Sequence, residues 1–152
     1  MDGRVAQSVH PAFVEIIRQM TGDEATVIRG ILQYDKPTAI VEVRRAVTAQ
    51  TPEFLVLIRN LLPMINKDTG APMEFPGVDV MVDNWVRLGL VEVDYMYQVA
   101  GPGAYDWLWS RHEVLRLKEM DGDAPPLLGS RNGLIQRTSL GLAFAQAVGL
   151  MA

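Results

Sequence analysis

The residues with side chains suited to acid–base, nucleophilic or metal chemistry are few and scattered along this chain of 152 residues. Its two histidines, His10 and His112, lie far apart, and neither has an acidic neighbour at the spacing of a metal site. We expect His10 to cap the first helix and His112 to fill space on an apolar stripe. There is no cysteine, which excludes a thiol nucleophile, a disulfide and a cysteine metal site.

Two short motifs resemble parts of known ligand sites but lack the remaining residues that such sites need. Asp121 and Asp123 have the Asp-x-Asp spacing of calcium loops, but the following Ala-Pro-Pro supplies no side-chain oxygen and no bidentate glutamate. Gly101 and Gly103 lack the third glycine and the strand-to-helix setting of a phosphate-binding loop. No Gly-x-Ser-x-Gly elbow occurs, and no serine has an evident histidine partner. We therefore predict no enzyme, no cofactor and no metal.

Five arginines are candidates for contact with nucleic acid if folding brings them together: Arg44, Arg45, Arg87, Arg131 and Arg137. The expected helix 77–88 is the element that would read DNA, yet its outer face carries Asp79 and Asp83, whose charges oppose phosphate. The net charge of −4 and the pI near 5.1 also disfavour DNA. Arginines on edge strands equally serve to prevent edge pairing. A DNA-binding regulator is therefore the alternative and not the leading prediction.

Aromatic residues are dense around Tyr105, Trp107 and Trp109. On a helix, Trp107 and Trp109 cannot both face the core because they are two positions apart. One of them is then either an exposed interface anchor or a partly shielded surface tryptophan. These three aromatic residues are our candidates for a protein interface.

The elements that must position these residues follow from periodicity and capping. Thr21 and Glu24 form a capping box, Gly89 suits the end of a helix, and Thr138 suits the start of another. We expect helices from Pro11, over 21–34, over 77–88, over 104–118 and after Thr138, and strands over 38–45, 90–99 and 134–137. Residues 52–65 are ambiguous, and their spacing together with Pro52 favours a helix.

Two stretches predict the fold. Val82–Val91 is an amphipathic helix that ends at a glycine and runs into a strand, and Gly133–Phe144 is a strand that ends at a threonine cap and starts a helix. This order is typical of the helix and wing of a winged-helix domain. We predict an α+β, mainly helical fold with a winged-helix-like core and a helix inserted between the wing strands.

Four stretches look familiar in their order and spacing: His10–Ile17, Thr21–Ala25, Asn84–Val91 and Arg137–Phe144. With these stretches the chain resembles the abortive infection alpha family over roughly residues 9–148. Family members look like bacterial and phage-encoded proteins linked with anti-phage defence. The resemblance implies that role here and transfers no catalytic residue.

We expect residues 1–9 to be a flexible leader and residues 10–150 a single domain. The apolar stretch 54–65 is too short and too polar to span a membrane, and no signal peptide is visible, so we predict a cytoplasmic protein. The leading prediction is a non-enzymatic interaction module in phage defence. It would bind a protein partner or form a homo-oligomer.

Overall fold

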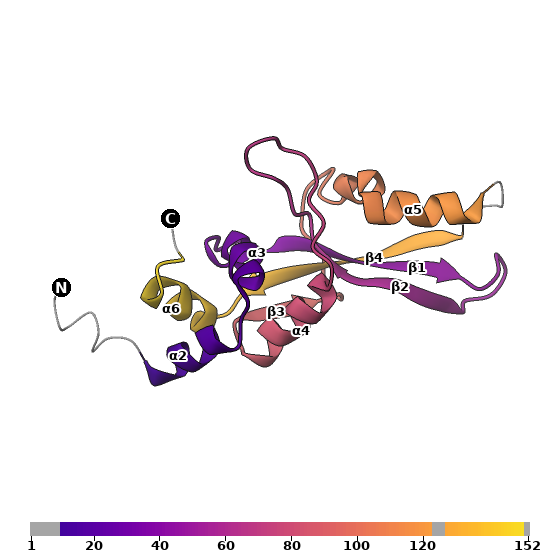
Figure 1. The fold of residues 1–152 in the computed structure, drawn as a ribbon. Coiled ribbons are helices and arrows are strands. Elements are labelled where there is room, and N and C mark those ends of the chain that lie inside the picture. Colours follow the sequence, from indigo (N-terminus) through magenta and orange to yellow (C-terminus); the bar gives the residue numbers. More distant parts are fainter. Residues whose placement is uncertain (1–9, 123–126, 151–152) are drawn as a thin grey trace. The chain divides into compact units, whose positions relative to one another are not determined.

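The computed structural model describes residues 10–122 and 127–150, so the expected leader 1–9 and Asp123 lie outside the described residues. The helices are α2 (Pro11–Arg18), α3 (Gly22–Leu32), α4 (Val78–Arg87), the 3₁₀ helix η1 (Asp106–Ser110), α5 (His112–Asp121) and α6 (Ser139–Ala147). The strands are β1 (Thr38–Ala46), β2 (Phe54–Leu61), β3 (Val91–Asp94) and β4 (Leu128–Arg137). Figure 1 shows their arrangement.

The strands form one antiparallel sheet in the order β2-β1-β4-β3, so β2 and β3 are its edges in the described chain. Helix accounts for 39% of the structure and strand for 24%, a roughly balanced α+β fold. Our prediction of a mainly helical, winged-helix-like fold is therefore wrong. The sheet contains more strand than the sequence predicts, because Phe54–Leu61 forms a strand instead of a helix and β4 begins at Leu128 instead of Leu134.

The error at β2 has a physical cause. The apolar residues of 52–65 fit helical spacing, but a short apolar run also fits a buried strand, and periodicity alone does not separate the two. The pairing of β2 with β1 decides the outcome, with Ala46 opposite Phe54 and Val41 opposite Leu61. A neighbouring strand satisfies the main-chain groups of β2, and the sequence of 52–65 holds no signal for that neighbour.

The inserted helix also differs from our prediction. Instead of one helix over 104–118, η1 and α5 are separated by Arg111, whose extended backbone (ψ 136°) ends the first and caps the second. The strand expected over 90–99 is only Val91–Asp94, whereas β4 extends back to Leu128. Main-chain pairing explains that extension, since the Ala46 N–H at the end of β1 donates to the Leu127 carbonyl at 2.9 Å.

The described residues pack as two compact units. Unit 1 comprises the described parts of Met1–Thr38, Asp83–Glu92 and Ile135–Ala152, and unit 2 comprises Ala39–Val82 and Val93–Leu134, less the undescribed residues. The strands β3 and β4 and the helix α4 each have residues in both units, so the division does not follow element boundaries.

Unit 1 is held together by caps and close contacts. The Thr138 hydroxyl donates to the Gly89 carbonyl at 2.6 Å and accepts from the Gly141 N–H at 2.9 Å, which confirms the predicted cap of α6. Gly89 has a φ of +78°, as a glycine after a helix end should. A Cβ added to Gly141 would lie 2.1 Å from the Leu90 carbonyl oxygen, so this crossing admits only glycine.

Unit 2 buries one face of its sheet under η1 and α5, as the place of α5 over the strands in Figure 1 indicates. The buried cluster takes one or two residues from each element: Val41, Val43, Leu61, Leu108 and Val114. Each of these aliphatic side chains contributes about 1.5–3 kcal/mol when it is fully buried. The cluster fixes β1, the base of β2 and α5 relative to one another.

Candidate functional site

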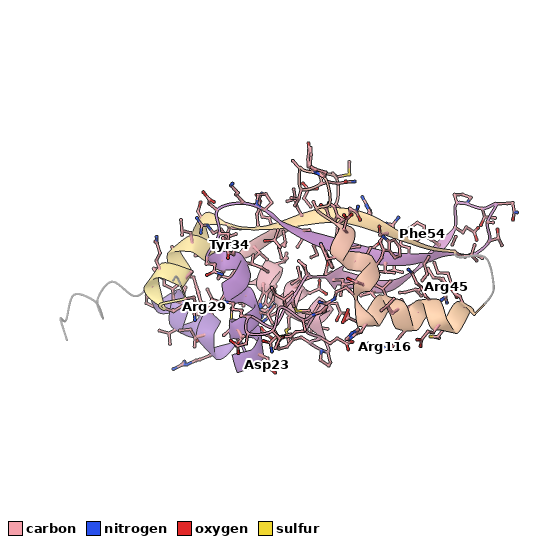
Figure 2. All side chains as sticks on the ribbon, turned by 90° about the horizontal axis from the view of Figure 1, so that it is seen from above. Asp23, Arg29, Tyr34, Arg45, Phe54 and Arg116 are labelled. Atoms are coloured by element: carbon pink, nitrogen blue, oxygen red, sulfur yellow. The ribbon has the colours of Figure 1, made fainter. Side chains whose placement is uncertain are left out.

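Four exposed apolar side chains gather at the end of the β1–β2 hairpin in unit 2. They are Val47, Phe54, Leu55 and Val56, and their exposed fractions run from 43% at Val56 to 58% at Leu55. We call this cluster the hairpin patch. Figure 2 labels Phe54 toward this end of the hairpin, and Arg45 on the side of the strands that faces α5. Apolar side chains that cluster on the surface, rather than scatter singly, mark interaction sites.

The register of the hairpin assigns these side chains to the two faces of the sheet. Leu55 lies opposite Arg45 and therefore shares its face, whereas Phe54 lies opposite Ala46 on the other face. Arg45 points toward α5, where its Nη2 lies 2.6 Å from Asp121 Oδ1. The hairpin patch thus presents apolar groups on both faces of the strand and not only on one.

Phe54 shares its face with Val56 and Arg44, because Val56 lies opposite Arg44. The Arg44 guanidinium sits 3.9 Å from the centre of the Phe54 ring, and its Nε lies 2.6 Å from Glu42 Oε1. These contacts fix the ring without covering it. Phe54 is therefore an ordered aromatic group on a surface, which loses little side-chain freedom if a partner binds.

The main chain of β2 is also accessible along the outer edge. The Val47 N–H donates to the Glu53 carbonyl at 2.9 Å, so the polar groups of Glu53 face β1. Because these groups alternate in direction along a strand, Phe54 and Val56 turn their N–H and C=O groups away from β1. The order of the sheet places no described strand on that side.

The pairing of β2 with β1 is irregular at the base of the hairpin and regular at its outer end. The register shifts by one residue at Leu57 and again near Asn60, and Asn60 has a φ of +54°. The Tyr95 hydroxyl donates to Asn60 Oδ1 at 3.0 Å. Burial, and to a smaller extent the negative charge of Glu42, raises the pKa of Tyr95 to about 12. The two register shifts and the hydrogen bond between Tyr95 and Asn60 fix the base of the hairpin. The regularly paired stretch that remains is Phe54–Val56.

The most deeply buried charge in the described chain is Arg111, which is 2% exposed. Its Nη1 donates to the Met64 carbonyl at 2.7 Å and its Nη2 to the Met73 carbonyl at 2.6 Å, and its Nε pairs with Glu113 at 3.0 Å. Arg111 thus ties both ends of the loop between β2 and α4 to the start of α5. With these partners it is a structural clamp and not a ligand site, and no sequence signal pointed to it.

The predicted aromatic interface is only partly on the surface. The Tyr105 hydroxyl donates to the Gly133 carbonyl at 2.6 Å and accepts from the Val99 N–H at 2.8 Å. Trp107 is half-buried, packs against the core cluster and donates to the Ala104 carbonyl at 3.0 Å. Trp109 is the exposed member, with Lys118 Nζ 5.0 Å from its ring centre.

The five candidate arginines are divided between the units and are mostly engaged. Arg44, Arg45 and Arg131 lie in unit 2, and Arg87 and Arg137 in unit 1. Arg87 donates to Gln19 Oε1 at 2.7 Å, Arg137 donates to the Leu32 carbonyl at 2.9 Å, and Arg131 stacks 5.7 Å from the centre of the Tyr95 ring. In unit 2, Arg44 and Arg45 already pair with the carboxylates of Glu42 and Asp121. DNA contact by these arginines stays a prediction.

The remaining candidates for chemistry have structural places. His10 Nδ1 accepts from the Ala12 N–H at 3.0 Å, which confirms its predicted cap. His112 is exposed at the start of α5, so our expectation that it fills space is wrong. Asp121 pairs with Arg45. Within residues 10–122 and 127–150, no group of three or more His, Asp and Glu side chains is placed to hold a metal ion.

No helix in the described part of the chain combines the length and apolar character needed to cross a membrane.

The candidate site that the geometry supports best is the hairpin patch together with the open edge of β2. We did not predict this site because the spacing of residues 52–65 favours a helix. The signal that was present is the unbroken apolar run Phe54–Ile58, which is typical of a strand without charged protection.

The sequence pattern of the family described as abortive infection alpha matches residues 1–148, nearly the whole chain. No curated protein matches this chain. Among solved structures, the chain is similar to an uncharacterized protein from the hydrocarbon-degrading marine bacterium Alcanivorax borkumensis SK2. The two are 14% identical with a TM-score of 0.50, and the match covers 91% of this chain and 92% of that one. At this identity the likeness concerns the fold alone.

Proposed function

Since this chain belongs to the abortive infection alpha family, we propose that it serves bacterial abortive infection as a non-enzymatic interaction module acting by protein contact or self-association. Abortive infection and phage defence come from the family. The mode of action is argued from the chain's own residues.

The observation that carries the proposal is the hairpin patch on an open strand edge. Natural proteins protect such edges with charged residues, proline or covering elements, because unpaired main-chain groups beside apolar side chains invite another chain. The segment Phe54–Ile58 contains no charged residue and no proline. An unprotected apolar edge lowers the solubility of a protein. A functional contact at this edge explains why β2 carries no protecting charge or proline.

Two further observations agree with a contact role. The guanidinium groups of Arg44, Arg45, Arg111 and Arg116 pair with carboxylates or carbonyls of the same unit, so these cations form part of the scaffold. The four side chains of the hairpin patch itself are exposed and apolar, and apolar surface is the kind that protein interfaces bury at their centre.

The test is a phage challenge of bacteria that express the chain. We expect the unchanged chain to lower the plating efficiency of at least one phage in a panel, and the Leu55→Glu variant to lose that protection. The matched control is Val80→Glu, which places the same charge on another exposed apolar residue of unit 2 (66% exposed). Full protection by Leu55→Glu, or none by the unchanged chain against any phage, would contradict the proposal.

A further inference from the structure

We propose that β2 pairs edge to edge with β2 of a second copy of this chain, antiparallel about a two-fold axis that passes through Leu55. The inference deepens the proposed function and rests on it, since it names the partner that the hairpin patch contacts. The resulting dimer would extend the sheet continuously from one copy into the other.

The first step is the direction of the main-chain groups. Phe54 and Val56 turn their N–H and C=O groups to the open edge, and they are separated by Leu55, whose groups face β1. In an antiparallel pair centred on Leu55, Phe54 lies opposite the second copy's Val56, and the reverse holds by symmetry. Both pairs are then hydrogen-bonded, which gives about four main-chain bonds across the axis.

The second step is the match of side chains. The same register places an aromatic residue opposite a β-branched one twice, which is a favourable cross-strand pair. Leu55 meets its own counterpart on the opposite face, at the short spacing of a non-hydrogen-bonded pair. The strand is therefore complementary to itself at each of the three positions Phe54, Leu55 and Val56, and all three are exposed in the single chain.

The third step is charge. In this register Glu53 falls opposite the second copy's Leu57, so no charged residue of β2 faces a like charge across the axis. The register shift at Leu57 ends the regular stretch on one side, and Pro52 ends it on the other. A short regular segment between two irregular ones permits few alternative registers, which favours one defined pairing over indefinite edge-to-edge growth.

The opposite edge of the sheet offers no comparable surface. The strand β3 has only four residues, Val91–Asp94, and carries Glu92 and Asp94. Short, charged edges resist pairing. A second copy would therefore meet β2 with its own β2 and not with its β3, and the closed two-fold dimer follows from that restriction.

The chain has no cysteine, so single-cysteine variants report directly on proximity. Leu55→Cys places two thiols at a Cα separation of about 4.5–5.5 Å across the proposed axis, within the range of a disulfide. Under mild oxidation we expect about tenfold or more covalent dimer compared with the control Val80→Cys, because pairing raises the local thiol concentration. Equal yields from the two variants would overturn the proposal.

A charge exchange tests the axis itself and guards against variants that merely misfold. We expect Leu55→Glu and Leu55→Lys each to sediment as monomers, since like charges then face each other, and an equimolar mixture of the two to recover the dimer. Val80→Glu should remain dimeric. A mixture that stays monomeric, although each variant keeps the circular dichroism spectrum of the unchanged chain, would overturn the two-fold pairing.

The phage challenge separates the two claims. If the chain is monomeric and gives no excess cross-link, yet Leu55→Glu still loses protection, the pairing is overturned and the proposed function stands with another protein on the strand. If the dimer and its cross-link form but Leu55→Glu protects fully, the pairing stands and the proposed function fails. Dimer, recovery by mixing and loss of protection together support both.

Discussion

The two compact units of this chain differ in where they leave apolar side chains exposed. Unit 1 buries Trp85 and Leu90 completely, and Gly141 lies so close to the Leu90 carbonyl that no side chain fits. Its exposed aliphatic residues, such as Val14, Ile17 and Leu140, lie on helices. Unit 2 has a comparable buried cluster at the base of its sheet but leaves Phe54, Leu55 and Val56 open on an edge strand. The difference is that unit 2 combines exposed apolar side chains with unpaired main-chain groups on an edge strand, and we assign the contact to unit 2 for that reason.

The largest effect that we expect comes from the buried charge that supports unit 2. Arg111→Met leaves Glu113 without its ion pair and the Met73 carbonyl without the Arg111 donor, whereas the Met64 carbonyl keeps the Met73 N–H as a donor at 2.9 Å. Breaking a buried pair in this way costs about 3–5 kcal/mol. Urea unfolding measures the loss. Arg116→Met is the control, because Arg116 pairs with Glu74 on the surface, and it should change stability far less. Equal losses would show that Arg111 is not the clamp.

The next largest effect tests the close packing of unit 1. Gly141→Ala places a Cβ against the Leu90 carbonyl, and we expect it to lower the free energy of unfolding by about 2–3 kcal/mol because the backbone must shift. Gly30→Ala in α3 has open space around its Cβ and should raise it by about 0.5–1 kcal/mol. Thermal unfolding of both variants tests this crossing; a neutral Gly141→Ala would contradict the account.

A smaller effect concerns the base of the hairpin. Tyr95→Phe removes the hydrogen bond to Asn60 Oδ1 and should cost about 1 kcal/mol. The raised pKa of Tyr95, about 12 in the folded chain against 10 in the unfolded one, means that the unfolded state loses its proton first. Stability is therefore full below pH 10 and falls between pH 10 and 12. In Tyr95→Phe that fall should be shallower, as melting curves across this pH range would show.

The smallest effect distinguishes two surfaces of unit 2. Trp109 is exposed and belongs to η1, not to β2. The Lys118 ammonium lies over its ring, 5.0 Å from the ring centre. If β2 carries the contact, Trp109→Ala should leave the sedimentation mass unchanged and alter stability by less than about 1 kcal/mol. A monomeric Trp109→Ala, beside a Leu55→Glu variant that stays dimeric, would move the interface to the aromatic group that the sequence first indicated.

Sequence reasoning was right where the determinants are local. The caps at His10, Thr21 and Thr138 depend on one side chain and an N–H within three residues of it, and all three are present. The end of α4 at Gly89 is equally local. Such features can be predicted from a single sequence because no distant residue is needed to form them. The second half of the predicted capping box was wrong, because Glu24 Oε2 accepts from Asn84 Nδ2 at 3.1 Å instead of from the Thr21 N–H.

Sequence reasoning failed where distant residues decide. Residues 54–61 are a strand because β1 lies beside them, and Arg111 is buried because Met64 and Met73 present carbonyls to it from 47 and 38 positions away. The winged-helix prediction had the order of helix and strand right at α4–β3 and at β4–α6, but the number of strands was wrong. The candidate site was missed for the same reason, since an edge strand is defined by the partner that it lacks.

The most direct test of the account is amide hydrogen exchange in β2 at several protein concentrations. Pairing of β2 with a second copy predicts that the Phe54 and Val56 amides, which face the open edge, exchange more slowly as concentration rises. The Leu55 amide faces β1 and should change much less, which provides a control within the same strand. Exchange of Phe54 and Val56 that is fast and independent of concentration would contradict the account.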